Sequence, residues 1–327
     1  MENKVTSVVI WLNKENGNDG NIWGVADSRI SYKTENGIKR SLEIFPKLYE
    51  LELRVSTHVL RLNYSKIHSY GMGIAGNVTL CMAVKNVVDF LFGHLSITHE
   101  HEDKSPDKLL EQFTTVNQFN ENLRSRLPTM EHVINVIQNV AKQVMYSHVQ
   151  NTCNRPEKFE IAIFGYCIKE EKFKAFNVIH ETLSDLEFQA KKDQMDCFNS
   201  RIERIVFDEN SDDIQYLLLG DKKEQISELI NEKMSNLDNS NKLKYWRIPN
   251  EVIRSIVDEE NYMATIGSYA QTITVDKQFC RVGGAATMKT GLQYFGYRLG
   301  WMNEDGNYIM PVIGDYYFTP SGLDLSI

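Results

Sequence analysis

Residues 71–92 read GMGIAGNVTLCMAVKNVVDFLF, and the hydrophobic period changes in the middle of this stretch. The first part completes a strand-like run over residues 66–75, and its glycines permit a sharp turn. From Val78 onward, apolar residues recur at i, i+3, i+4 and i+7, which is typical of an amphipathic helix. The stretch therefore predicts a strand that turns at Gly76 into a helix over residues 78–92.

Further strands and helices are expected on both sides of this turn. Two β-branched, apolar runs at residues 5–12 and 22–26 are separated by turn residues and predict a hairpin. The other expected strands cover 42–53, 159–167, 173–179, 214–219 and 264–275, and the other expected helices cover 106–123, 130–145, 222–234 and 249–257. This order lacks strict βαβ alternation and an internal repeat, so it predicts an α+β fold of packed layers.

The composition is that of a globular protein. The 327 residues are 42% hydrophobic and 24% charged, so the chain can bury a sizeable core. A net charge of -8 opposes nonspecific binding to polyanions, and no apolar run approaches the ~20 residues that cross a bilayer. We therefore expect no nucleic-acid partner and no membrane partner. Because the first residues lack the apolar core of a signal peptide, we expect a cytoplasmic protein.

The metal-binding residue types do not form a ligand pattern. The chain has five cysteines, an odd number, and they lie far apart without a C-x-x-C pair. This pattern predicts free thiols. His99 and His101 lie in a charged segment, and their spacing does not suit the i, i+4 pair of a helical metal site. No metal and no other cofactor is therefore expected.

Five short motifs occur in the order that they have in a known family. They are TSVVI at 6–10, GVADSR at 24–29, IFPKL at 44–48, GIAGN at 73–77 and IAIFGY at 161–166. In these motifs the chain resembles the proteasome β-type subunits and the HslV peptidase, which are N-terminal-nucleophile (Ntn) hydrolases. The resemblance implies a four-layer αββα sandwich.

The same resemblance implies a domain organisation. Residues 1–279 would form one proteasome-like Ntn-hydrolase domain, with insertions near 49–65 and 98–128. Residues 280–327 would form a C-terminal extension packed on that domain. Insertions of this kind usually lie on loops or edges.

The resemblance also implies a catalytic mechanism. Thr6 matches the threonine nucleophile, and removal of residues 1–5 would free its α-amino group, whose pKa of about 7.7–8 suits a general base. Asp27 and Arg29 match residues that support the nucleophile. Gly76 matches the residue whose backbone N–H binds the oxyanion. A peptide or another amide would be the substrate.

Two positions depart from the family pattern. Glu43 stands at the position of the family's catalytic lysine, or Ile44 does if the register shifts by one, so the positive charge is reversed or absent. A carboxylate there would raise the proton affinity of the nucleophile. The cations nearest to it in the chain are Lys39, Arg40 and Lys47. Strand alternation makes replacement by such a neighbour geometrically unfavourable. Val5, a β-branched residue, precedes Thr6 where the family's self-cleavage turn has glycine.

The sequence leaves two functions open. One is a threonine-type peptidase or amidohydrolase; the other is a catalytically inactive proteasome-like subunit that acts as an assembly or regulatory partner. The residues also fit structural roles, since Thr6 suits a strand, Asp27 to Arg29 suit a hairpin end, and Gly76 suits a tight turn. The resemblance further implies a homo-oligomer, in the form of a ring. The helices at 78–92 and 129–149 each carry more apolar positions than a solvent-facing helix needs, so one of them would bury part of that surface against a neighbouring subunit. The alternative is that the insertions cap this surface and the protein is a monomer or dimer.

Overall fold

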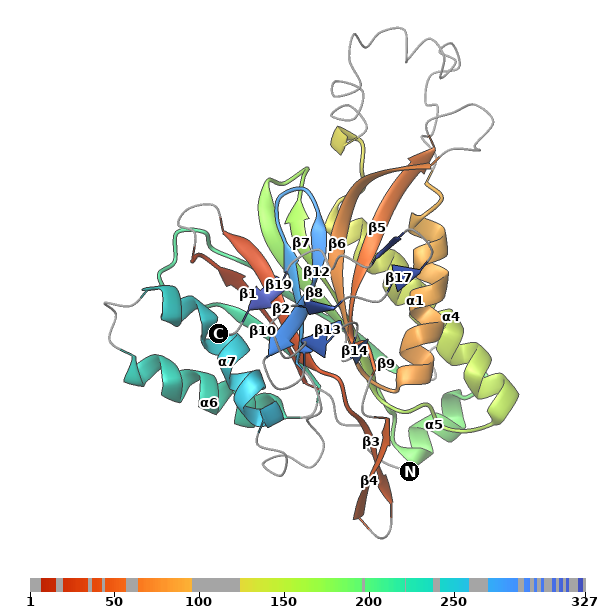
Figure 1. Cartoon of the computed structure of the whole chain (residues 1–327). Coiled ribbons are helices and arrows are strands. Elements are labelled where there is room, and N and C mark those ends of the chain that lie inside the picture. Colours follow the sequence, from red (N-terminus) through yellow and green to blue (C-terminus); the bar gives the residue numbers. More distant parts are fainter. Residues whose placement is uncertain are drawn as a thin grey trace, which may run out of the picture.

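The computed structural model describes residues 7–15, 20–34, 37–42, 45–56, 64–95, 124–195, 198–220, 222–237, 242–258 and 270–287, with short strands between 291 and 325. In this part of the chain, two mostly antiparallel sheets pack face to face and carry helices on their outer faces (Figure 1). The predicted α+β class is confirmed, with two sheets arranged as a sandwich. None of the helices described here is long and apolar enough to cross a membrane.

The first sheet has five antiparallel strands in the order β5-β6-β7-β8-β9. The strands are β5 (Leu48–Ser56), β6 (Tyr64–Gly76), β7 (Phe159–Cys167), β8 (Lys172–Glu181) and β9 (Asn199–Val206). Its helices are α1 (Val78–Phe92), α4 (Met130–Thr152) and α5 (Asp185–Lys191), and α1 and α4 pack together on one side of the sheet (Figure 1). The first half of the segment predicted as an insertion near 49–65 thus belongs to a strand of this sheet.

The second sheet has eight strands, seven of them in the order β10-β1-β2-β11-β12-β13-β14. Its strands are β10 (Tyr216–Gly220), β1 (Ser7–Asn13), β2 (Asn21–Asp27), β11 (Ala270–Val275), β12 (Cys280–Thr287), β13 (Gly291–Tyr294), β14 (Tyr297–Arg298) and β19 (Leu323–Leu325), which pairs with β12. The helices α6 (Lys223–Asn236) and α7 (Lys242–Asp258) pack on its outer face (Figure 1).

Three two-stranded ribbons complete the described elements. They are β3 (Ile30–Thr34) with β4 (Gly37–Leu42), β15 (Trp301–Met302) with β16 (Tyr308–Ile309), and β17 (Val312–Ile313) with β18 (Tyr316–Tyr317).

Strand alternation explains the three hydrophobic clusters of the core. On β7, Phe159, Ile161 and Ile163 belong to the cluster with α1 and α4, whereas Ala162 and Phe164 belong to the cluster between the sheets. The strand β1 is buried along its whole length because its two faces meet different partners. Its Val8 side packs between the sheets, and its Val9 side packs against α6 and α7. A sheet that is covered on both faces accounts for the near-continuous apolar sequence of β1.

Several expected elements are confirmed and others differ. The 5–12/22–26 hairpin is present as β1 and β2, and the helix at 78–92 has the predicted bounds, with the Asn77 side chain accepting a hydrogen bond from the Leu80 N–H at 3.1 Å. The predicted start of a helix at Pro249 is wrong, because α7 begins at Lys242 and contains the proline. The predicted helix at 106–123 lies outside the described residues.

Gly76 ends β6 in a conformation that side chains rarely adopt. Its φ is +87°, and a Cβ atom placed there would lie 2.5 Å from the Lys158 carbonyl oxygen. We expect Gly76→Ala to lower the free energy of unfolding by about 2–4 kcal/mol, through backbone strain and a clash that no flexible side chain relieves. Gly73→Ala on the same strand is the control, because its nearest heavy atom would lie 3.4 Å away. Equal losses in urea denaturation would contradict the described turn.

His180 on β8 is fully buried, and neither ring nitrogen has a hydrogen-bond partner among the described residues. Its ring lies between those of Phe159 and Phe198, with centroids 4.7 and 5.4 Å away. Burial lowers the pKa of His180 from 6.5 to about 4, and the charge of Lys142 adds to this effect. The unfolded chain therefore binds this proton at a higher pH than the folded chain does.

The stability that neutral His180 provides is present above pH 6.5 and is lost as the pH falls toward 4. Between pH 7 and pH 5 we expect a loss of about 2 kcal/mol from this residue. His180→Phe is expected to remove that share of the pH dependence, as measured by urea unfolding at the two pH values. An undiminished loss in the variant would show that His180 does not titrate as described.

Candidate active site

One end of the eight-stranded sheet brings the start of β1 beside the end of β2. Pairing of β1 with β2 places Val8 opposite Ala26, so Ser7 comes next to Asp27. The Ser7 backbone N–H donates a hydrogen bond to Asp27 Oδ1 at 3.1 Å. On the other side, Ser7 pairs with Gly220 of β10, and Asp27 pairs with Ala270 of β11. The main chain at the start of β1 therefore faces a buried carboxylate.

Asp27 forms a buried ion pair with Lys47. Lys47 Nζ lies 2.8 Å from Asp27 Oδ1, and the two side chains are 1% and 0% exposed. The same ammonium donates to the Arg29 carbonyl oxygen at 2.6 Å, and the Arg29 N–H donates to Asp27 Oδ2 at 3.1 Å. Both carboxylate oxygens thus accept hydrogen bonds, as a buried charge requires.

Burial also changes the proton affinity of the lysine. Removal from water lowers the pKa of Lys47 below 10.5, and the negative charge of Asp27 opposes this shift. The amine therefore gives up its proton more readily than an exposed lysine does. A group of this kind can stabilise a developing negative charge or take part in proton transfer.

The segment that carries Lys47 lies between the two sheets. Phe45 N–H donates to the Ser28 carbonyl at 2.9 Å, and the Lys47 carbonyl accepts from the Ile74 N–H at 2.9 Å. Ile74 belongs to β6, and Gly76 follows two residues later at the end of that strand. The candidate oxyanion donor is therefore close in sequence to a residue that touches the Lys47 main chain.

The structure brings together some of the residues expected from the sequence. Asp27 and Arg29 are in direct contact, and Gly76 ends β6, the strand whose Ile74 N–H binds the Lys47 carbonyl. Thr6 and Glu43 lie outside the described residues. The cation that meets Asp27 belongs to Lys47, which sequence reasoning considered only as a geometrically unfavourable substitute. That reasoning assumed a strand from 42 to 53, whereas β5 begins at Leu48, so strand alternation does not constrain Lys47.

A cluster of two glutamates and a cysteine resembles a metal site but has a structural role. Oxygen and sulfur atoms of Glu131, Cys167 and Glu170 lie within 4.8 Å of one another, as metal ligands do. The Lys174 ammonium, however, lies 2.7 Å from Glu131 Oε1 and also pairs with Glu170. Lys174 is 1% exposed, so its charge takes the place that a metal ion would need. These residues therefore form an ion cluster around the buried Lys174, and the cluster joins α4 to β8.

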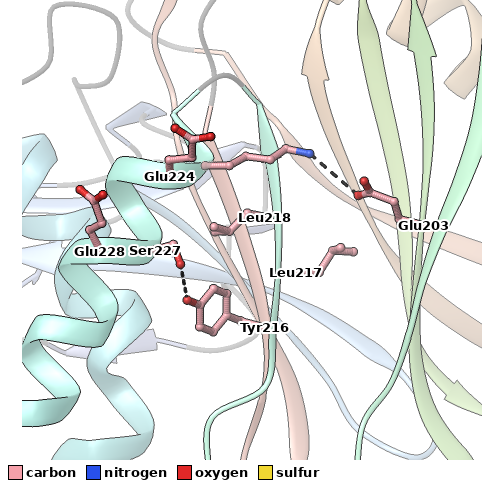
Figure 2. A pocket seen from close by; sticks show the side chains of 8 residues that line it. Glu203, Tyr216, Leu217, Leu218, Glu224, Ser227 and Glu228 are labelled. Atoms are coloured by element: carbon pink, nitrogen blue, oxygen red, sulfur yellow. Dashed lines mark hydrogen bonds and ion pairs between the residues drawn. The ribbon is translucent and has the colours of Figure 1, made fainter.

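A shallow pocket of about 500 Å³ lies beside β10, bordered by α6 and by β9 (Figure 2). Its lining residues are Glu203, Tyr216, Leu217, Leu218, Lys223, Glu224, Ser227 and Glu228. The hydroxyls of Tyr216 and Ser227 are 2.7 Å apart (Figure 2). None of these residues belongs to the Asp27–Lys47 group, and the open, partly acidic wall is typical of a solvated surface.

No family model and no curated protein matches the chain. Three solved structures of Anbu, from two organisms, are similar to it. A mutant of Anbu from Hyphomicrobium sp. strain MC1 has a TM-score of 0.39 at 13% identity, over 83% of this chain and 82% of that one. Anbu (ancestral beta-subunit) from Yersinia bercovieri has 0.42 at 10% identity, over 82% and 81%. Anbu from Hyphomicrobium sp. strain MC1 has 0.37 at 13% identity, over 83% and 82%.

These comparisons correct the family expected from the motifs. The expected assignment to the proteasome β-type subunits and HslV is corrected, because the solved structures that are similar to this chain are those of Anbu proteins. Short motifs such as TSVVI and GIAGN can mislead in this way. The first is ordinary strand sequence and the second is a strand-to-helix turn that needs glycine, so local structure alone can produce both.

Proposed function

We propose that the chain is an amide hydrolase, of the threonine peptidase or amidohydrolase type, whose nucleophile is Thr6 after removal of residues 1–5. The observation that best supports this proposal is the buried Asp27–Lys47 pair beside the Ser7 nitrogen. Thr6 is bonded to that nitrogen in the chain. The Thr6 hydroxyl would therefore lie only a few bonds from the nitrogen that donates a hydrogen bond to Asp27.

In this mechanism the chain's own groups transfer a proton and stabilise the negative charge that develops on two oxygens. The free α-amino group of Thr6, with a pKa of about 7.7–8, accepts the hydroxyl proton as the oxygen attacks the carbonyl carbon. The same amine then gives the proton to the leaving nitrogen, and water hydrolyses the resulting ester. The Lys47 ammonium stabilises the attacking oxygen, and Asp27 holds that ammonium in place. The Gly76 N–H serves as the oxyanion donor.

Lys47, and not Glu43, would supply the cation of this site. Its ammonium is held by two oxygens, Asp27 Oδ1 and the Arg29 carbonyl, at 2.8 and 2.6 Å. A cation buried to 1% exposure acts through a medium of lower effective dielectric constant than water, which strengthens its effect on a nearby oxyanion. Arg29 would contribute its carbonyl and its N–H to the support of the pair.

We also propose the finer points of architecture and location. The layers would form a four-layer αββα sandwich of the Ntn type in one domain over 1–279, with residues 280–327 packed on the same domain. The pairing of β12 with β11 from Cys280 onward supports this arrangement. A cytoplasmic location would agree with the free thiols of Cys153, Cys167 and Cys280 among the described residues.

A β-lactone tests this proposal directly, because ring opening by a nucleophilic hydroxyl leaves the whole reagent attached as an ester. After incubation and proteolysis, mass spectrometry is expected to find the adduct on a peptide that begins at Thr6. An adduct confined to another residue, or no adduct together with no hydrolysis of amide substrates, would refute the proposed nucleophile.

A subunit role is the second candidate, and exposed apolar side chains on α1 favour it. Val87, Phe90 and Leu91 are 43%, 65% and 41% exposed, and Val136 of α4 is 37% exposed. Several exposed large apolar side chains on one helix are typical of an interface. The chain would then be a homo-oligomer, arranged as a ring, with or without activity.

We expect light scattering coupled to gel filtration to find a species larger than the 37.8 kDa monomer at micromolar concentration. Phe90→Glu is expected to raise the dissociation constant at least about tenfold, because it places a charge in the apolar contact. Leu186→Glu on α5 is the control, since Leu186 is 86% exposed and lies on a different helix. A monomeric wild type would exclude the subunit role.

A further inference from the structure

Gln271 on β11 makes two hydrogen bonds to the main chain that carries Lys47. Its Nε2 donates to the Phe45 carbonyl oxygen at 2.6 Å, and its Oε1 accepts from the Lys47 N–H at 2.8 Å. The residue is 2% exposed, so water does not compete for either bond. The side-chain amide therefore binds the segment 45–47 in the way that a neighbouring strand would.

These bonds complete the hydrogen bonding of the segment. Phe45 N–H is bound by the Ser28 carbonyl, and the Lys47 carbonyl is bound by the Ile74 N–H. Pro46 has no N–H to satisfy. The Pro46 carbonyl accepts a hydrogen bond from the Tyr49 hydroxyl. Gln271 binds the two groups that remain, the Phe45 carbonyl and the Lys47 N–H. Buried backbone groups left without partners are costly. One side chain thus fixes both ends of the segment.

The strand β11 also orders the other half of the ion pair. Ala270 pairs with Asp27, and Gln271 pairs with Ala26, in the register of β11 with β2. Asp27 is therefore positioned by strand pairing, and Lys47 is positioned by the next residue of the same strand. The two charged groups share one rigid support, which holds the 2.8 Å contact between Nζ and Oδ1.

We infer that Gln271 is a positioning residue that sets the Lys47 ammonium against Asp27. Its effect on catalysis rests on the proposed function, whereas its effect on the ammonium does not. Apolar side chains of similar size cannot replace it, because the segment needs one donor and one acceptor. A protonated carboxyl group can replace it, because the acid hydroxyl donates and the other oxygen accepts.

The test measures hydrogen exchange of the Lys47 ammonium by NMR in protein labelled with ¹⁵N-lysine. The signal is assigned by its disappearance in Lys47→Met. Gln271→Met is expected to speed this exchange at least about tenfold, since it removes two buried hydrogen bonds. Gln138→Met is the matched control, because Gln138 on α4 makes its hydrogen bond to Ser200 at 2.8 Å and is expected to leave the exchange unchanged.

Gln271→Glu adds a readout that a purely structural role would not change. Below the pKa of the introduced carboxyl, exchange of the Lys47 ammonium is expected to be as slow as in the wild type, and above that pKa it is expected to be fast. This variant also keeps the test decisive if Gln271→Met fails to fold. Exchange within twofold of the wild type in both variants at every pH would overturn the inference.

The outcomes separate this inference from the proposed function. If Gln271 controls the ammonium but the wild type hydrolyses no amide, the positioning role stands and the hydrolase proposal fails. If Lys47→Met abolishes hydrolysis while Gln271→Met leaves the ammonium unchanged, the hydrolase proposal stands and the positioning role fails.

Discussion

Lys47→Met is expected to lower the free energy of unfolding by about 3–5 kcal/mol, which is the usual effect of leaving one member of a buried ion pair without its partner. Asp27 is 0% exposed, so its carboxylate would lose the ammonium and gain no water in exchange. Two backbone N–H groups, of Ser7 and Arg29, would remain as its donors. Urea denaturation followed by circular dichroism measures the change.

Two further variants make this prediction specific. Lys233→Met removes a lysine whose pair with Glu251 is long, at 3.9 Å, and about half exposed, so it is expected to change stability by less than about 0.5 kcal/mol. The double variant Lys47→Met with Asp27→Asn removes both charges and is expected to be more stable than Lys47→Met alone. A loss below about 1 kcal/mol for Lys47→Met would contradict the buried pair.

Thr6→Ala is expected to reduce amide hydrolysis by about 10⁴-fold or more, because it removes the proposed nucleophile and leaves no hydroxyl for the α-amino group to activate. The leading residues are also expected to stay attached in this variant, if the same hydroxyl performs their removal. Stability is expected to change little, since the side chain is small. Steady-state hydrolysis of a fluorogenic peptide amide provides the measurement.

Thr6→Ser is the matched variant for this prediction. It keeps a hydroxyl at the same position, so activity is expected to remain within about tenfold of the wild type. Ser7→Ala is the neighbouring control, because the structure assigns the Ser7 backbone N–H, and not its hydroxyl, to the contact with Asp27. Retained hydrolysis in Thr6→Ala would assign the activity to another residue.

The parts of the fold that could be predicted were those with a strong local signal. The helix at 78–92 follows from its apolar period and from Asn77, whose side chain caps it. The β1–β2 hairpin follows from two apolar runs around turn residues. The helix α5 was missed although its capping box, Ser184 with Glu187, is visible in the sequence as S-x-x-E before Phe188.

Other elements depend on tertiary contacts that local patterns do not encode. The strand β9 is half-exposed and rich in charge, and it was missed because its pairing with β8 supplies the order that its composition does not indicate. The start of α7 was placed too late because Pro249 is typical of a first turn. In the structure the carbonyl of Trp246, in the turn before the proline, accepts hydrogen bonds from Trp11 Nε1 at 2.8 Å and from Asn13 Nδ2 at 3.4 Å.

In the candidate site, too, some residues have a local sequence signal and others depend on tertiary contacts. Asp27, Arg29 and Gly76 could be named from motifs, because each also has a local structural role at a strand end or a turn. Lys47 could not be chosen over its neighbours, because the choice depends on where β5 begins and on a glutamine 224 residues away in the chain. Residues that act through such distant contacts are visible only in the folded protein.

The central claim, that Thr6 becomes the N-terminal nucleophile, is tested most directly by the intact mass of the purified full-length chain after expression and incubation. The account predicts loss of residues 1–5 and a chain that begins at Thr6. A stable mass that still includes Val5 would contradict it, because an acylated nitrogen on Thr6 cannot accept the proton of the hydroxyl.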